Sequence, residues 1–175
     1  PANEMPVISS GSSFSAAENQ SLVGTVIATD ADGDLLTYQL TGTNAADFSI
    51  TSAGVLSFVT SPNYEVRSSY AVMVTVSDAS SSSSQELTIS VTNVNEMPAI
   101  TSAASATINE NTTLALTFTS TDPDGDVLSY ALSGKDAALF NVDASTAALS
   151  FKAAPDFETP SDADGDNIYL ITVTG

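Results

Sequence analysis

The feature that most constrains this chain is an internal repeat with a period of about 92 residues. The tetrapeptide "NEMP" at positions 3–6 returns at 95–98, and "TDADGDLLTY" at 29–38 returns as "TDPDGDVLSY" at 121–130. A fixed period of this length is typical of tandem structural units that are built alike. The 175 residues are therefore predicted to form two small domains rather than one large domain.

The two copies differ in their C-terminal parts. "YAVMVTV" from Tyr70 matches "YLITVTG" from Tyr169 only if the second copy carries six inserted residues, among them "DADGD" at 162–166. The second copy has no counterpart of "QELTISVTNV", so it lacks a final strand and exposes a sheet edge. This indicates a piece of a longer array, or an edge that something else completes. We expect three segments, a linker tail at 1–6, a first repeat at 7–97 and a second repeat at 98–175.

Each copy is a series of short alternating runs separated by Gly, Ser, Asn and Asp. In "YAVMVTV", Val72, Val74 and Val76 fall on one apolar face, which is the two-residue period of a half-buried β-strand. About seven such runs in each copy is the spacing of a Greek-key β-sandwich. We therefore predict an all-β fold of tandem seven-strand sandwiches of the cadherin or immunoglobulin type, the second without its last strand. The serine-rich run at 79–84 is predicted to be a solvated loop.

The chain is strongly acidic, with 21 Asp and Glu against 3 Lys and Arg and a formal charge of -18. This charge excludes nucleic acid and anionic membranes as partners, because both are polyanions, and it favours cations. The absence of Cys and His removes disulfides, the usual zinc ligands and the common nucleophile–base pairs of enzymes. No apolar run approaches the roughly 18 residues of a membrane span. We predict a binding or structural protein that is not an enzyme and does not insert into a membrane.

The two "DxDGD" segments, which begin at Asp30 and Asp122, place three carboxylates within five residues. A polar turn explains one or two Asp residues, but not three that recur at matching positions. Ca2+ fits, because it takes roughly six to eight oxygen ligands from carboxylates, Asn side chains and backbone carbonyls. An EF-hand does not fit, because Gly falls fourth instead of sixth and the twelfth residue is Thr41 or Ser133. The sequence therefore predicts Ca2+ sites assembled from several loops.

In these features the sequence resembles the cadherin family in its bacterial cadherin-like form, over nearly the whole chain. The resemblance implies Ca2+ at the junction between successive units, bound by residues of both units and of the linker. The linker "NVNEMP" is one residue shorter than the animal pattern and has Asn and Glu in place of two Asp, which implies fewer or weaker ions. The junction ligands implied by the resemblance are Glu18, Glu65, Asn93, Asn95, Glu96, Asp122 and Asp124.

The resemblance also implies half of such a junction at each end of the chain. The N-terminal half comprises Asn3, Glu4, Asp30, Asp32 and Asp78, and the C-terminal half comprises Glu110, Asp156 and Glu158. Asp34 and Asp126 are either ligands or solvent-facing caps of their turns. The inserted "DADGD" at 162–166 is either a local Ca2+ site or a solvated acidic insertion.

The leading functional prediction is an extracellular, Ca2+-binding tandem-repeat module of a larger adhesin-like surface protein. Its partners would be neighbouring repeats of the same protein and homotypic contacts between cells, and Ca2+ would stiffen the junction. The alternative is a Ca2+-dependent carbohydrate-binding module that contacts polysaccharide. The absence of Trp counts against that alternative, and Tyr64 and Tyr169 are its candidate exposed aromatic residues.

Overall fold

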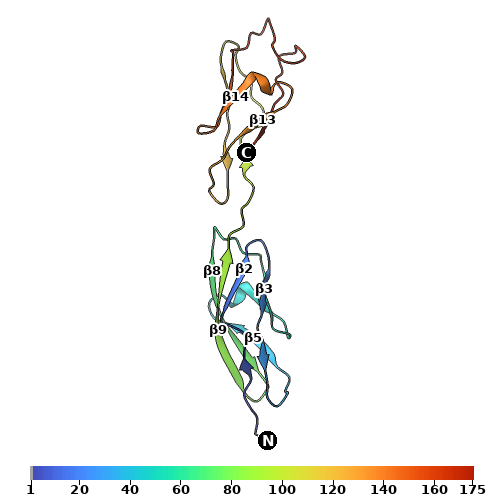
Figure 1. Ribbon diagram of the computed structural model, residues 1–175, viewed down its shortest axis with the longest axis vertical. Coiled ribbons are helices and arrows are strands. Elements are labelled where there is room, and N and C mark those ends of the chain that lie inside the picture. Colours follow the sequence, from blue (N-terminus) through green and yellow to red (C-terminus); the bar gives the residue numbers. More distant parts are fainter. Residues whose placement is uncertain (1) are drawn as a thin grey trace. The chain divides into compact units, whose positions relative to one another are not determined.

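The computed structural model describes residues 2–175, which form two compact units. The first unit ends at Val94, and the second is Asn95–Gly175. Apart from the short 3-10 turns η1 (Ala45–Asp47) and η2 (Ala137–Leu139), all regular structure in the described residues is β-strand (Figure 1). The prediction of an all-β fold is thereby confirmed.

The first unit contains nine strand segments that make seven passes of the chain, because two of the passes are interrupted. The segments are β1 (Val7–Ile8), β2 (Ser13–Ala17), β3 (Leu22–Thr25), β4 (Ala28–Thr29), β5 (Thr37–Thr41), β6 (Phe48–Ile50), β7 (Val55–Phe58), β8 (Ser69–Ser77) and β9 (Ser82–Thr92).

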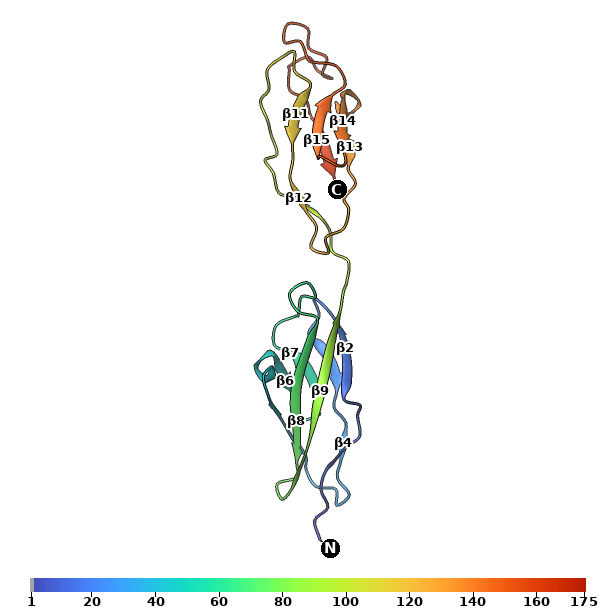
Figure 2. The same cartoon turned by 90° about the vertical axis from the view of Figure 1, so that its left-hand side faces the viewer.

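Two sheets face each other in this unit. One has the strand order β2-β9-β8-β5 and the other has the order β3-β7-β6, with β1 paired to β4 at the side. Figure 2 shows β2, β9 and β8 next to one another in the first sheet. The pairing of β2 with β9 is parallel, from Ser13 opposite Thr88 to Ala17 opposite Thr92, whereas the other pairs are antiparallel. The first and last passes of the unit are therefore hydrogen-bonded neighbours.

The core of the first unit lies between these sheets. Val72, Val74 and Val76 of β8 are 0–1% exposed, as the two-residue period predicted, and Leu87 and Ile89 of β9 are fully buried beside them. Each such side chain contributes about 1.5–3 kcal/mol relative to an exposed position. The last strand therefore supplies a large part of the apolar core as well as two ladders of hydrogen bonds.

The serine-rich run only partly forms the loop that the sequence predicted. β8 and β9 are joined by residues 78–81, while Ser82, Ser83 and Ser84 pair with Ser77, Val76 and Thr75. The loop prediction was therefore wrong for residues 82–84. Serine is a weak strand former, but these residues continue a long hairpin whose partner strand fixes their register, and Ser83 donates its hydroxyl to the carbonyl of Pro6.

The second unit repeats this arrangement with shorter strands. Its segments are β10 (Ala99–Ile100), β11 (Leu114–Thr117), β12 (Ser120–Thr121), β13 (Ala131–Ser133), β14 (Phe140–Asp143), β15 (Ala148–Phe151) and β16 (Thr172–Thr174). Strands β11, β15 and β14 form one sheet (Figure 2), β13 pairs with β16, and β10 pairs with β12.

The core of the second unit is smaller. Its buried apolar residues, among those described, are Phe118, Phe140, Leu149 and Phe151, against twelve in the first unit. Residues 105–109, which match β2 in the repeat, form no strand. In the first unit β2 is bonded to β9, and no second-unit strand takes the place of β9. A segment without a partner for its backbone groups does not form a ladder.

Candidate metal-binding ends of the two units

The three "DxDGD" segments fold into the same self-closed turn. In each, the amide of the fifth residue donates to the carboxylate of the first. The distances are 3.2 Å from Asp34 to Asp30, 3.2 Å from Asp126 to Asp122 and 2.9 Å from Asp166 to Asp162. The glycine at the fourth position has φ between +76° and +79°, a conformation that side chains disfavour. These bonds fix the turn without a ligand and leave the remaining carboxylate oxygens available.

The N-terminal end of the first unit gathers carboxylates around one such turn. Ligand oxygens of Asp30, Asp32 and Asp34 lie within 4.8 Å of one another, so the exposed Asp34 side chain belongs to this cluster, while its backbone amide closes the turn on Asp30. The amide of Glu4 donates to Asp32 Oδ2 over 2.7 Å, which ties the entering chain to the turn. Asp30 Oδ2 is buried and has no hydrogen-bond partner among the described residues. A buried carboxylate oxygen without a donor is suited to a bound cation.

Asp78 joins this end from the β8–β9 hairpin and is 5% exposed. Its carboxylate accepts hydrogen bonds from Asn3 Nδ2 at 3.0 Å, from the Ser81 hydroxyl at 2.7 Å and from the amides of Ser80 and Ser81. The Asn3 amide, followed by these Ser81 and Ser80 donors, holds the pKa of Asp78 well below its ordinary value. These four donors therefore favour the ionised form of Asp78 in the folded unit.

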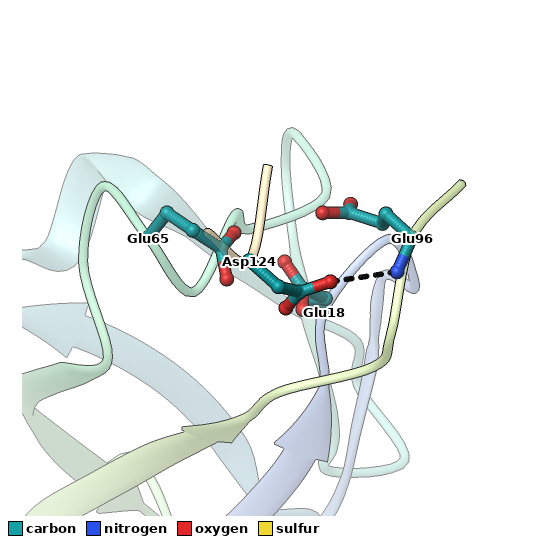
Figure 3. A group of neighbouring side chains, drawn as sticks. All are labelled: Glu18, Glu65, Glu96 and Asp124. Atoms are coloured by element: carbon teal, nitrogen blue, oxygen red, sulfur yellow. Dashed lines mark hydrogen bonds between the residues drawn. The ribbon is translucent and has the colours of Figure 1, made fainter. Parts of the chain in front are cut away.

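The corresponding end of the second unit repeats these contacts. The amide of Glu96 donates to Asp124 Oδ2 over 2.8 Å (Figure 3), as that of Glu4 does to Asp32. Asn95 Nδ2 donates to the carbonyl of Glu96 over 3.2 Å, matching a bond from Asn3 to Glu4. Asp124 Oδ1 is buried without a hydrogen-bond partner in the described part of the chain. The repeat thus preserves the placement of the acidic groups as well as their identity.

The C-terminal end of the first unit is built around Glu18, which follows β2. Its side chain is buried, with the residue 1% exposed, and its two oxygens accept the amides of Tyr64 at 2.8 Å and Val94 at 2.7 Å. Glu65 follows Tyr64 in the same loop, and Asn93 is exposed directly after β9. Glu18 therefore joins three segments at this end of the sandwich.

The matching end of the second unit carries Glu110, Asp156 and Glu158. One carboxylate oxygen of each lies within 4.8 Å of the others. Glu110 accepts the amide of Phe157 at 2.9 Å, as Glu18 accepts that of Tyr64. All three residues are exposed, whereas Glu18 is buried.

The inserted acidic loop is held by a residue that the sequence reasoning did not select. Asp136 is 3% exposed, and its oxygens accept the amides of Ala163 at 2.8 Å and Leu170 at 2.7 Å. Asn44 occupies this position in the first unit and accepts the amide of Ala71 and a guanidinium nitrogen of Arg67. The sequence signal that could have pointed to Asp136 is that the first repeat has Asn, Asn44, at the equivalent position.

Within the insertion, oxygens of Asp162, Asp164 and Asp166 lie within 4.8 Å of one another. Burial raises the pKa of Asp162, but hydrogen bonds from the backbone amides of the loop, that of Asp166 first, outweigh it, so that this pKa lies below its ordinary value. Asp164 forms an exposed ion pair with Lys135 at 3.4 Å.

The chemistry of all these ends fits a hard cation. The acidic groups offer oxygen ligands only, and the chain contains no His or Cys for a zinc site. The two tyrosines predicted as exposed aromatic residues differ in their surroundings. Tyr169 packs edge-on against Phe140 and Phe151 in the core, and only Tyr64 of the two candidate tyrosines is exposed, at 39%.

Known structures with this fold are cadherin extracellular domains. Human protocadherin-24 EC1-2 in its crystal form II has a TM-score of 0.66 at 22% identity, covering 85% of this chain and 80% of that one. A further structure of human protocadherin-24 EC1-2 has a TM-score of 0.65 at 19% identity, covering 99% of this chain and 94% of that one. Drosophila N-cadherin EC1-4 has a TM-score of 0.62 at 22% identity. The match covers 98% of this chain but only 45% of the N-cadherin chain. These likenesses define a cadherin-like Greek-key sandwich.

The chain belongs to the bacterial Ig domain family, whose sequence profile matches residues 3–92. No relative was found among the curated proteins. Residues 2–175 contain no helix with the length and hydropathy required to cross a membrane.

Proposed function

We propose that the chain is an extracellular, Ca2+-binding tandem-repeat module of a larger adhesin-like protein. In this proposal Ca2+ binds at the junction of the two units and stiffens the array for adhesion at the cell surface. The observation that carries it is the buried, unpartnered oxygen of Asp30, in a turn whose contacts recur around Asp122 and Asp124. The same cation chemistry is thus prepared at the same end of each unit.

The junction ligands are proposed to come from both units. The first unit would contribute the end at which Glu18 organises the loops, and the second would contribute the end built on the "DPDGD" turn. The full proposed set is Glu18, Glu65, Asn93, Asn95, Glu96, Asp122 and Asp124. Asn3, Glu4, Asp30, Asp32 and Asp78 would form half of a second junction, and Glu110, Asp156 and Glu158 half of a third.

The proposed mechanism is electrostatic linkage. Without metal, carboxylates of the two units repel each other in a chain whose net charge is already -18. An ion bound by both units replaces this repulsion with attraction, so its binding free energy opposes motion between the units. Half-sites would bind more weakly, because water supplies the missing ligands.

The names of two similar structures support the proposed location and partners. One similar structure, with a TM-score of 0.56 at 22% identity, is described as protocadherin gamma B7 extracellular cadherin domains, and another, with a TM-score of 0.58 at 18% identity, as a protocadherin gammaB7 cis-dimer. We infer an extracellular location and contacts with neighbouring or identical repeats. The fold is one of adhesion-type domains, and we assign no catalytic role.

Calorimetric titration of Ca2+ into the chain tests this proposal. The double variant Asp122→Ala, Asp124→Ala is expected to bind at least one ion fewer than the wild type. The matched control is Asp47→Ala, which removes an acidic group whose one salt bridge within residues 2–175 is a long one of 3.8 Å to Arg67. The control keeps the wild-type stoichiometry. A double variant that also keeps it would contradict the junction assignment.

Small-angle X-ray scattering tests the mechanical consequence separately. Scattering with Ca2+ should fit a single extended particle, and scattering with chelator should require a wider distribution of maximum dimensions. The Asp122→Ala, Asp124→Ala variant should scatter like the chelated wild type under both conditions. Identical wild-type profiles with and without Ca2+ would contradict the stiffening mechanism even if ions bind.

A further inference from the structure

The pentapeptide "DADGD" occurs twice in the chain, at 30–34 in the first unit and at 162–166 in the insertion of the second. Both copies close through a hydrogen bond from the fifth amide to the first carboxylate. Their glycines also share a positive φ, of +79° and +77°. The two segments therefore form a matched pair, with the same sequence and the same turn in two different surroundings.

Each copy contains an Asp–Gly peptide bond, Asp32–Gly33 in the first and Asp164–Gly165 in the second. An aspartate followed by glycine is reactive, because glycine has no Cβ that keeps its amide nitrogen away from the side-chain carboxyl carbon of the aspartate. Attack of that nitrogen on Cγ closes a five-membered succinimide ring, and hydrolysis of the ring gives either aspartate or isoaspartate. The reaction requires a carboxyl group that can turn toward the next amide.

In the first unit, a backbone amide restrains this carboxyl group. Asp32 Oδ2 accepts the amide of Glu4 over 2.7 Å. The third Asp–Gly bond of the chain, Asp124–Gly125, is restrained in the same way, because Asp124 Oδ2 accepts the amide of Glu96 over 2.8 Å. A hydrogen bond from an amide to an ionised carboxylate is among the stronger ones in proteins. Ring closure at these two positions therefore requires that bond to break first.

No backbone amide within residues 2–175 holds the carboxylate of Asp164. Its side chain is 52% exposed, and it contacts the ammonium group of Lys135 at 3.4 Å, which is itself 62% exposed. An exposed ion pair of this length contributes little, because water competes for both charges. The neighbouring Gly165 has open space around it, with no atom within 4 Å of the position that a Cβ would take. The Asp164 carboxyl group can therefore rotate onto the amide of Gly165.

We propose that Asp164–Gly165 is a modification site, at which the folded second unit spontaneously converts aspartate into isoaspartate. The Gly165 nitrogen forms a bond to Asp164 Cγ, and one Cγ–Oδ bond breaks. The leaving oxygen takes the amide proton and one proton from solvent, and departs as water. A second water adds to the ring at the main-chain carbonyl carbon of Asp164 and breaks its bond to nitrogen, so that the chain now runs through Cγ.

The two steps balance without a further reactant. One water is lost and one is gained, and the proton taken from solvent returns when the new carboxyl group ionises. The main chain gains one carbon atom between positions 164 and 165. The 2.9 Å bond from the Asp166 amide to Asp162 spans this point, so the change disrupts the closure of the turn. This covalent change involves no residue of the proposed ion set and needs no metal.

Incubation of the full chain in chelator, at physiological temperature and neutral pH, tests the proposal. Trypsin cleaves after Arg67, Lys135 and Lys152, so each Asp–Gly bond lies in a different peptide. Mass spectrometry detects the succinimide as the loss of one water, and an isoaspartate methyltransferase with labelled S-adenosylmethionine quantifies isoaspartate in each peptide. Isoaspartate should form at least about tenfold faster in peptide 153–175 than in peptide 1–67, because only Asp32 must first release an amide.

The same incubation in denaturant is the control for local sequence. The two identical pentapeptides then differ in no contact, so peptides 1–67 and 153–175 should form isoaspartate at the same rate. In the folded chain, Glu4→Pro removes the amide that holds Asp32 and should raise the rate in peptide 1–67.

Two variants of Asp164 assign the reaction to this residue. Asp164→Glu keeps the charge but would need a six-membered ring, so the excess of isoaspartate in peptide 153–175 should disappear. Asp164→Asn is the positive control, because the same nitrogen attacks a carboxamide and ammonia leaves more readily, so the succinimide should form faster than in the wild type.

Three results would overturn the proposal. Equal rates in peptides 1–67 and 153–175 of the folded chain would show that the amide of Glu4 provides no protection. An excess in peptide 153–175 that persists in Asp164→Glu would place the reaction at another residue. An Asp164→Asn variant that forms succinimide in denaturant but not in the folded chain would show that the folded loop prevents ring closure.

Discussion

Replacing Glu18 with Gln isolates the role of the buried carboxylate. A glutamine keeps one acceptor oxygen and places an NH2 group opposite the other amide, so one of the two donors, Tyr64 or Val94, loses its partner. An unpaired buried donor costs about 1–3 kcal/mol, and the remaining bond loses its charge, at roughly 1 kcal/mol more. The variant should therefore lose about 2–4 kcal/mol of first-unit stability in chelator.

The assay is amide hydrogen exchange at Val74 in β8, followed by NMR in chelator. The matched control is Glu110→Gln, whose side chain accepts one amide and is exposed. It removes the same charge from a strongly acidic chain, so relief of general repulsion is common to both variants. Its loss in second-unit stability should be about 1 kcal/mol or less. Equal losses in the two variants would refute the assignment of Glu18 as a buried support of three segments.

The remaining predictions concern the backbone, pH and core. Gly54→Ala should destabilise the first unit by about 3 kcal/mol or more in thermal unfolding, because the φ of Gly54 is +78° and a Cβ there would overlap the carbonyl of Val26. Gly11→Ala is the control and should change the stability little, because a Cβ at Gly11 would meet open space. In chelator, stability should fall as pH drops below about 4, because Asp78 has a lowered folded pKa, and Asp78→Asn should flatten this fall in acid titrations. Leu56→Ala should cost about 3–5 kcal/mol by denaturant unfolding, and Leu149→Ala, which lines an open apolar groove within the second unit, nearer 2 kcal/mol. A larger loss for Leu149→Ala than for Leu56→Ala would contradict the difference expected between the two cores.

The fold was largely predictable because its signals are local and occur twice. The alternation in β8 and the absence of helical periods determine an all-β chain, and the 92-residue offset determines where the second unit repeats the first. What the sequence did not indicate depends on long-range pairing. Serines 82–84 are strand because β8 pairs with them, and residues 105–109 are not strand although their counterpart is.

The acidic ends were predictable as groups of residues but not as contacts. Spacing alone selects the Asp residues of the "DxDGD" turns, since three carboxylates in five positions are unusual. It does not indicate that the first Asp closes the turn through the fifth amide, because that bond depends on the αL glycine. Asp136 was missed because it is a lone acidic residue in sequence, and only the fold brings the insertion to it.

The parallel pairing of β2 with β9 has a consequence for synthesis of the chain. Ser13 and Thr88 must meet across about 75 residues, and the entropy of closing such a loop is of order 4 kcal/mol before any constant term. On a ribosome, Leu87, Ile89 and Val91 emerge after every other strand of their unit, so the apolar interior stays open until translation has passed them. In a polypeptide with many such repeats, each nascent unit would therefore keep aggregation-prone apolar surface exposed until its own final strand is synthesised. Because the final strand is synthesised last, it is the strand that closes the core and ends the period in which the unit can aggregate.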